Sequence, residues 1–404
     1  MASAVLVRGL GLIVAMVAAR LLGAEAFGQV GVVQQVVAMI GTLAGLGVGT
    51  TASRFIAASR GSDRRGTGRV LGATALWSWG SAILGGAALA ALAPWLATGP
   101  LAAPSMTDTL LAAVPLLVLS LVSQAQTGGL AGFEAFRAGA VASVTSGLLG
   151  IPLQLLGAWK FGASGFVIGL AATELLRWLL GLQALAGAMA KAQVDWHQPG
   201  WADVRRLMGF GLPSMLASML VGPVLLVSFA IVGRQSQGYS EVGLFQATQQ
   251  YRNLLIFVSV QSAAAIVPVL ALAHGALDRQ AVARGLRRAV AWSLGSSIPL
   301  SLLLALSAPL AMGGFGPTFA EHGSLLVWLA LLAPVQALNA VGMAVLSAVN
   351  RPWTSLWVTV VFAVFALATV MLMPTALGLI LSQGLGSIPA LAVIAWALRH
   401  QWRG

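Results

Sequence analysis

Long apolar stretches recur along the whole chain and are separated by short polar segments. A helix that crosses a hydrocarbon core needs about 20 apolar residues. Twelve stretches of suitable length lie at 3–22, 28–52, 70–95, 108–131, 138–159, 163–187, 208–232, 242–270, 286–312, 323–347, 353–373 and 375–398. Polar and apolar positions do not alternate within them, which disfavours the strands of a membrane barrel. The pattern therefore predicts an all-α polytopic membrane protein with twelve transmembrane helices.

The second half of the chain repeats the first at a constant shift of 215 residues. The shift places Gly28 on Gly243, Gln34 and Gln35 on Gln249 and Gln250, and Asp63 with Arg64 on Asp278 with Arg279. Each repeat holds six stretches, an even number, so both copies share one orientation and form two six-helix lobes related by a parallel internal repeat. We expect an N-terminal lobe over 1–190, a cytoplasmic interfacial linker over 191–206 and a C-terminal lobe over 207–404.

Basic residues gather in alternate connections, which sets the expected orientation. The two most basic connections carry Arg54, Arg60, Arg64, Arg65 and Arg69, and Arg279, Arg284, Arg287 and Arg288. Because Lys and Arg are retained in cytoplasmic loops, we expect these connections and both termini in the cytoplasm. The formal net charge of +12 thus encodes orientation rather than nucleic-acid binding.

The composition excludes several classes of function. The chain is 58% hydrophobic and 8% charged, with a mean hydropathy of +0.91, so twelve spans leave no room for a water-soluble catalytic domain. Cysteine is absent, and no cluster of His, Asp and Glu has the spacing of metal ligands. No phosphate-binding loop or catalytic pattern occurs. We therefore expect no enzyme, no catalytic residue, no metal and no cofactor.

Polar residues inside the spans are the candidate functional residues, since Arg at the bilayer centre costs about 2.5–3.5 kcal/mol even on a lenient scale. Within 242–270, helical periodicity places one polar stripe along the helix, formed by Gln246, Gln249, Gln250 and Asn253, with Arg252 at its edge. Gln34 and Gln35 are the matching pair in the first repeat. We expect this stripe to line a wet cavity between the lobes, although hydrogen bonds that only hold the bundle together would use the same residues.

Other charged residues in or beside the spans allow two interpretations each. Arg8, Arg20 and Arg54 either extend to an interface or bind a ligand. Glu174 and Arg177 stand three residues apart in the sixth stretch, the spacing of helical neighbours. They form either a structural ion pair or an ion-coupling site.

The segment 19–57, ARLLGAEAFGQVGVVQQVVAMIGTLAGLGVGTTASRFIA, resembles the first hairpin of Wzx-type polysaccharide flippases. These belong to the multidrug/oligosaccharidyl-lipid/polysaccharide (MOP) exporter superfamily. The residues that match its pattern of an arginine, a Leu-Gly step and an acidic-Phe-Gly turn are Arg20, Leu22, Gly23, Glu25, Phe27 and Gly28. The segment 240–250, SEVGLFQATQQ, is similar to the corresponding turn of the second half.

The resemblance implies a MATE-like fold and a flippase that carries an undecaprenyl-diphosphate-linked oligosaccharide, such as an O-antigen, capsule or exopolysaccharide unit, across the bacterial inner membrane by alternating access. It also implies the bilayer and the polysaccharide polymerase machinery as partners of a monomer. Because guanidinium groups bind phosphate in bidentate fashion, our hypothesis places the diphosphate on Arg20, Arg54 and Arg252. The glutamines and Asn253 would bind sugar hydroxyls.

Three alternatives remain. A multidrug cation antiporter of the same superfamily would present a carboxylate in its first helix, and the stretch 3–22 has none. A lipid II flippase is chemically closer, but that family usually has two additional helices. A membrane-embedded glycosyltransferase would need a catalytic acid or base and larger loops.

Overall fold

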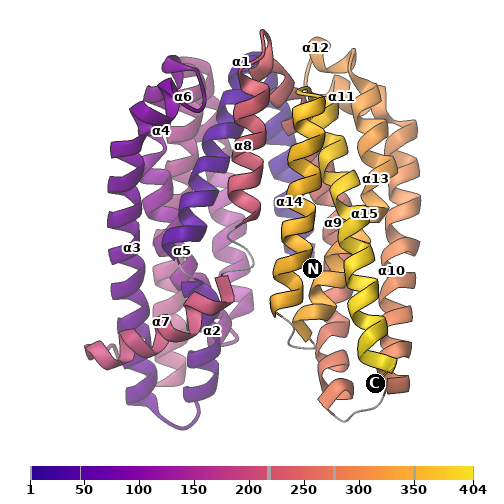
Figure 1. The fold of residues 1–404 in the computed structure, drawn as a ribbon. Helices are drawn as coiled ribbons and strands as arrows, with labels where there is room; N and C mark the ends of the chain where they lie inside the picture. Colours follow the sequence, from indigo (N-terminus) through magenta and orange to yellow (C-terminus); the bar gives the residue numbers. More distant parts are fainter. Residues whose placement is uncertain (1, 46, 216–219, 276–278, 349–351, 404) are drawn as a thin grey trace. The chain divides into compact units, whose positions relative to one another are not determined.

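In a computed structural model the chain consists of α-helices joined by short connections (Figure 1). The structure describes residues 2–45, 47–215, 220–275, 279–348 and 352–403, and within these ranges there is no β-strand. The chain divides into two compact units. One comprises Met1–Leu22 and Gln29–Gly222, and the other comprises Gly23–Gly28 and Pro223–Gly404. We call them the first and the second unit.

The first unit contains most of the N-terminal helices. These are α1 (Ala2–Gly45), α2 (Val48–Ser59), α3 (Arg64–Thr98), η1 (Pro104–Met106), α4 (Thr107–Ala112), α5 (Val114–Gly132), α6 (Phe136–Ala192) and α7 (Trp201–Met215). Two of them are interrupted by a glycine at positive φ, α1 at Gly23 (φ 78) and α6 at Gly162 (φ 60). Glycine adopts this conformation without the penalty that a Cβ would bring. Both α1 and α6 therefore contain two successive helices.

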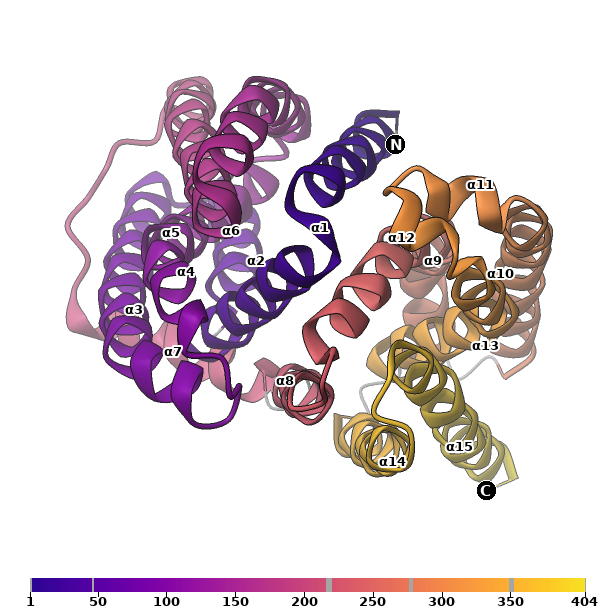
Figure 2. The same cartoon turned by 90° about the horizontal axis from the view of Figure 1, so that it is seen from above.

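Small residues allow the helices of the first unit to pack closely, with α5 between α2, α3 and α6 (Figure 2). Gly41, Gly45 and Gly49, spaced four residues apart, face α5, where a Cβ at Gly49 would lie 2.9 Å from the carbonyl oxygen of Gln124. The two halves of α6 meet at Gly157 and Gly165, where a Cβ on either would overlap the backbone of the other. Close backbone approach of this kind stabilises helix pairs in lipid.

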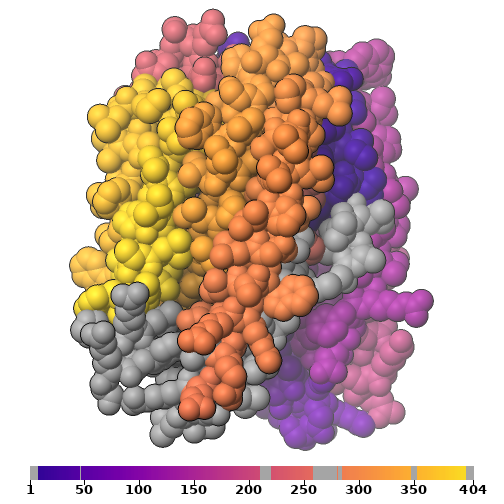
Figure 3. Space-filling model, turned by 90° about the vertical axis from the view of Figure 1, so that its right-hand side faces the viewer, coloured from indigo at the N-terminus to yellow at the C-terminus, as the bar shows by residue number. Residues whose placement is uncertain are grey.

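The second unit contains the C-terminal helices. These are α8 (Val221–Gly233), α9 (Gly238–Gly275), α10 (Arg279–Leu306), α11 (Ala308–Gly313), α12 (Pro317–Ala320), α13 (Gly323–Ala348), α14 (Pro352–Leu372) and α15 (Ala376–Arg403). In Figure 3 the yellow helices α14 and α15 lie beside the orange segment that includes α13. Their shared core includes Leu346 of α13, Val358 of α14 and Ile394 of α15.

The segment Gly23–Gly28 of α1 belongs to the second unit, where it meets the start of α9. A Cβ at Gly28 would overlap the carbonyl oxygen of Tyr239 and lie 2.7 Å from the amide nitrogen of Gly243. A Cβ at Gly243 would overlap the carbonyl oxygen of Ala24. Since the repeat relates residue 28 to 243 and 24 to 239, the two copies of one sequence motif contact each other symmetrically.

The helices agree with the predicted twelve spans and two lobes. Eight helices among the described residues are long and apolar enough to cross a membrane. Two of these, α1 and α6, hold two predicted spans each, and α9 covers the span predicted at 242–270. Helix α8 covers only the second half of the span predicted at 208–232, whose first residues lie in α7. Helix α3 begins at Arg64 and α10 at Arg279, as the shift of 215 residues requires. Asp278, which the repeat pairs with Asp63, lies outside the described residues.

The segment after α6 is the predicted linker 191–206. The structure ends α6 at Ala192 and begins α7 at Trp201, and the intervening residues lie across α3, where a Cβ at Gly72 would come within 3.0 Å of Pro199. The two compact units meet in sequence at Gly222 and Pro223. The lobe boundaries at 190 and 207 remain a prediction.

Candidate functional site

Two adjoining cavities lie within the first unit, against α5 and α6. The first has a volume of about 540 Å³ and the second about 630 Å³. Both are lined by Ser123, Thr127 and Ala131 of α5 and by Arg177 of α6. The first cavity also reaches Arg8 of α1, and the second is also lined by residues of α2 and by Glu174.

The charged side chains that line these cavities are two arginines and one glutamate, Arg8, Arg177 and Glu174. Arg177 Nη2 lies 2.9 Å from Glu174 Oε1, so these helical neighbours form an ion pair. The second carboxylate oxygen of Glu174 is buried and has no hydrogen-bond partner in the structure. The first cavity, lined by both arginines, therefore has a net positive charge, whereas Glu174 balances Arg177 in the second.

A run of polar residues on α5 supplies neutral hydrogen-bonding groups. Its members that line a cavity are Ser120, Ser123, Gln124, Gln126 and Thr127. The hydroxyls of Ser120 and Thr127 donate to backbone carbonyls of their own helix, at 2.8 and 2.9 Å, which allows them to lie within an apolar span. The hydroxyl of Ser123 is buried without a partner. Buried polar atoms are usually hydrogen-bonded, so an unpaired one beside a cavity indicates water or a ligand.

Gln126 fixes one wall of the first cavity. In the amide orientation that satisfies both of its groups, its nitrogen donates to the backbone oxygen of Trp178 (3.2 Å) and its oxygen accepts from Trp178 Nε1 (3.0 Å). The ring of Trp178 also packs edge-on against Trp79, with 6.0 Å between centroids. These contacts hold the segment of α6 that carries Arg177.

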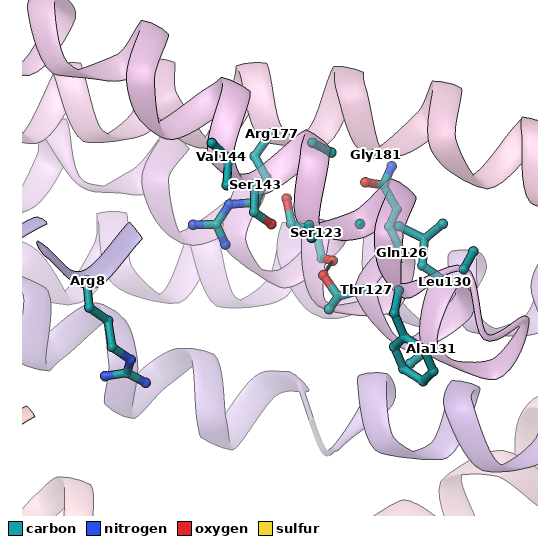
Figure 4. Close-up of a pocket in the computed structure, with 15 residues that line it drawn as sticks. Arg8, Ser123, Gln126, Thr127, Leu130, Ala131, Ser143, Val144, Arg177 and Gly181 are labelled. Atoms are coloured by element: carbon teal, nitrogen blue, oxygen red, sulfur yellow. Dashed lines mark hydrogen bonds between the residues drawn. The ribbon is translucent and has the colours of Figure 1, made fainter. Parts of the chain in front are cut away.

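The first cavity has its two arginines towards one end, together with Val144, and more apolar groups towards the other, together with Gln126. Figure 4 shows Arg8, Arg177 and Ser143 towards one side, and Leu130 and Ala131 towards the other. The apolar end continues past the turn between α5 and α6 to Ala135, Phe136 and Gly139. A guanidinium end joined to an apolar end suits a molecule that has an anionic and a hydrocarbon part.

The predicted substrate-binding residues of the first repeat lie elsewhere. Arg20, Gln34 and Arg54 have exposed side chains. Gln35 is half-buried, and its Nε2 donates to the carbonyl oxygen of Gly222 at 3.2 Å. None of these four residues lines either cavity, although α2 contributes Ser53, the neighbour of Arg54.

The polar stripe predicted on α9 meets polar side chains of α13 and α15 in the second unit. Arg252 Nε donates to Gln336 Oε1, and Gln249 Nε2 donates to Gln383 Oε1 at 2.9 Å. The structure therefore brings two of the predicted residues together with two that the sequence analysis missed. Of the remaining members of the stripe, Gln246 and Gln250 are half-buried and Asn253 is exposed.

Some of the missed residues belong to a polar run inside a predicted span, a feature that was used above only for the stripe on α9. Ser123, Gln124, Gln126 and Thr127 form a polar run inside a predicted span, as do the members of the α9 stripe. Gln336 is a single polar residue in an apolar span and gives a weaker signal. No group of three or more His, Asp or Glu that could hold a metal ion occurs in the part of the chain that the structure describes.

Comparison with known proteins gives a family and a fold. The family model described as "Polysaccharide biosynthesis protein" matches residues 1–274. Among solved structures, an inward-facing multidrug resistance MATE family transporter of the MOP superfamily is similar, with a TM-score of 0.81 and 17% identity, covering 98% of this chain and 95% of that one. The lipid II flippase MurJ has a TM-score of 0.74 and 13% identity, covering 98% and 86%. A MOP superfamily transporter from Pyrococcus furiosus has a TM-score of 0.67 and 17% identity, covering 98% and 94%. Among curated proteins, none matches the chain.

Proposed function

Because this chain belongs to the polysaccharide biosynthesis protein family and has the fold of MOP superfamily transporters, we propose that it is a flippase for an oligosaccharide linked to a polyprenyl diphosphate. Such a substrate has a doubly charged anionic group, many hydroxyls and a long hydrocarbon chain. It would move from the cytoplasmic to the periplasmic leaflet of the inner membrane by alternating access. The family and the fold are those of transporters and flippases rather than enzymes.

The observation that carries the proposal is the positive charge of the first cavity together with the hydroxyl groups that line both cavities of the first unit. Arg8 and Arg177 supply guanidinium groups, and the only acid in the lining, Glu174, is already paired with Arg177. Guanidinium groups bind phosphate oxygens through two parallel hydrogen bonds. Ser123, Thr127 and the amide of Gln124 offer partners for sugar hydroxyls.

The predicted site residues remain part of the proposal. Arg20, Arg54 and Arg252 are proposed to contact the diphosphate at some stage of the transport cycle. The proposed sugar contacts are Gln34, Gln35, Gln246, Gln249, Gln250 and Asn253. Arg252 and Gln249 would have to exchange their bonds to Gln336 and Gln383 for bonds to the substrate. The pair Glu174 and Arg177 is proposed to be an ion-coupling or structural pair.

An organic-cation antiporter is the competing function, since MATE transporters share the fold. A cation would require an acid whose charge is not already balanced, whereas the charge of Glu174 is balanced by Arg177. The lining also places a second guanidinium, that of Arg8, in the same cavity. Both charges would repel a cationic ligand.

The test is transport by the full chain in proteoliposomes, with a fluorescent oligosaccharide on a polyprenyl diphosphate as substrate and ethidium as the competing cation. The variants are Arg8→Gln and the charge-neutral double variant Glu174→Gln with Arg177→Gln, which leaves no buried carboxylate unpaired. Arg137→Gln is the matched control, because Arg137 is an exposed arginine of the same unit that lines neither cavity.

We expect wild-type protein to move the lipid-linked oligosaccharide and not ethidium. Losing one charge-assisted hydrogen bond costs about 1.5–3 kcal/mol, so each cavity variant should lower transport by about tenfold or more, with Arg137→Gln unchanged. Arg252→Ala should also fail to restore surface polysaccharide in a strain that lacks the gene. Transport of ethidium alone, or equal transport by all variants, would contradict the proposal.

A further inference from the structure

The first cavity joins a charged region to an apolar region, and a soluble anion would not need the apolar region. Its lining includes Arg8 and Arg177, but most of the remaining wall beyond Thr127 consists of apolar groups. These are Leu130, Ala131, Ala135, Phe136, Gly139, Ala140 and Ala142. Water that contacts such walls is released when a hydrocarbon group takes its place, and this release favours binding.

The apolar end reaches the surface of the unit at Phe136. This residue lines the cavity and is nevertheless 66% exposed. It is the first residue of α6, directly after the turn in which Glu134 pairs with Arg60 at 2.6 Å. That ion pair joins the connection after α2 to the turn between α5 and α6. The opening therefore lies at the end of the unit that carries the basic connection Arg60–Arg69.

We propose that this cavity binds a lipid phosphate, with the phosphate between Arg8 and Arg177 and the hydrocarbon chain passing Leu130 to leave the unit beside Phe136. The inference rests on the proposed function and adds the place where the first unit holds the lipid anchor. On the topology that the arginines predict, the chain leaves toward the cytoplasmic leaflet, from which the substrate starts. A free sugar phosphate would use the arginines and leave the apolar walls hydrated.

Binding to the detergent-solubilised full chain tests the two ends separately. The probes are geranyl diphosphate, which has both parts, inorganic pyrophosphate, which has only the anion, and geranylamine, which joins the same chain to a cation. Isothermal titration gives each affinity. Burial of the ten-carbon chain should make geranyl diphosphate bind wild-type protein at least about tenfold more tightly than pyrophosphate. Geranylamine should not compete with it.

The apolar end can be filled without touching the arginines. A Cβ at Gly139 would make ordinary contact with Leu130 at 3.6 Å, so Gly139→Leu extends into the cavity from a position that tolerates a side chain. Gly147→Leu is the matched control, since Gly147 lies on the same helix and a Cβ there meets nothing within 4 Å. Ala140→Phe is a second filling variant if Gly139→Leu does not yield folded protein.

We expect Gly139→Leu to lower the affinity for geranyl diphosphate to that for pyrophosphate while pyrophosphate binding stays unchanged. Gly147→Leu should keep the wild-type difference. The inference is wrong if geranyl diphosphate binds wild-type protein no better than pyrophosphate does. It is also wrong if Gly139→Leu and Ala140→Phe both retain the difference, because the chain would then lie elsewhere, for example in the detergent micelle.

Failure of this inference differs from failure of the proposed function. If the Gly139→Leu protein moves the lipid-linked oligosaccharide at the wild-type rate, the lipid path is wrong and the proposed function stands. If wild-type protein moves no lipid-linked oligosaccharide but shows the expected probe affinities, the lipid phosphate site stands and the proposed function is wrong.

Discussion

The symmetric contact between Gly28 and Gly243 gives the sharpest prediction of packing. A Cβ at Gly28 would lie 2.7 Å from the amide nitrogen of Gly243 and would overlap the carbonyl oxygen of Tyr239. Ordinary contact begins near 3.4 Å, so the contact with Gly243 alone requires the two backbones to separate by about 0.7 Å, and the overlap with Tyr239 requires more. The obstructing atoms are backbone atoms, which cannot rotate away as a side chain can. Overpacking of this kind costs about 1–3 kcal/mol.

A matched control separates this cost from helix propensity. Alanine is favoured over glycine inside a helix by about 1 kcal/mol, which partly offsets the clash in Gly28→Ala. Gly11 lies in the helix of α1 that precedes Gly23, and a Cβ there meets nothing within 4 Å. Gly11→Ala gains the same propensity without a clash. The difference between the two variants therefore isolates the packing cost of about 1–3 kcal/mol.

Thermal unfolding in detergent, followed by far-UV circular dichroism, measures the effect. We expect Gly28→Ala to melt below wild type and Gly11→Ala at or above it. Because Gly28 and Gly243 contact each other, the double variant with Gly243→Ala should cost less than the two single variants together, since one separation relieves both clashes. If Gly28→Ala and Gly11→Ala have the same melting temperature, the close approach of the two backbones is wrong.

Two further contacts make predictions of the same kind. Glu241 Oε2 accepts a hydrogen bond of 2.6 Å from the amide of Ala376 at the start of α15. Glu241→Gln removes a negative charge from this helix N-terminus, which should destabilise the protein by about 1 kcal/mol and lower its melting temperature. An unchanged melting temperature would contradict this prediction. Gly165→Ala should separate the two halves of α6 at Gly157 and destabilise the protein by about 1–3 kcal/mol, whereas Gly147→Ala should not. Equal melting temperatures of these two variants would refute the contact between Gly157 and Gly165.

The helices could be predicted because they depend on a local requirement. Each span must be apolar over a fixed length, and the boundaries predicted at 22–28 and 159–163 enclose the glycines at which α1 and α6 break. The repeat could be predicted for the same reason, since it is a property of the sequence itself. That Gly28 touches its own repeat partner Gly243 could not be predicted, because a shift in sequence gives no distance in space.

The candidate site was only partly predictable. The cost of burying polar groups in lipid identified Arg252 and Gln249, and it identified Glu174 and Arg177. It gave no partner for any residue on another helix, so Gln336 and Gln383 were missed. Arg8 was assigned as readily to an interface as to a ligand, and only the arrangement of α1, α5 and α6 places it in a cavity with Arg177.

Buried polar atoms without a hydrogen-bond partner help to identify ligand-binding residues, and they can be recognised only in the structure. A polar group that finds an internal partner is satisfied and stabilises the fold, whereas a buried one without a partner costs about 1–3 kcal/mol unless water or a ligand completes it. On α5 this applies to Ser123 Oγ, and on α13 to Gln336 Nε2 and Asn339 Oδ1. The repeat relates residue 124, the neighbour of Ser123, to Asn339. Buried polar atoms without a partner also occur on α3, at Trp77, and on its repeat partner α10, at Ser293. Of these helices of the first repeat, α5 lines the two cavities and α3 does not, so the unsatisfied atom of α5 is the one placed to meet a ligand.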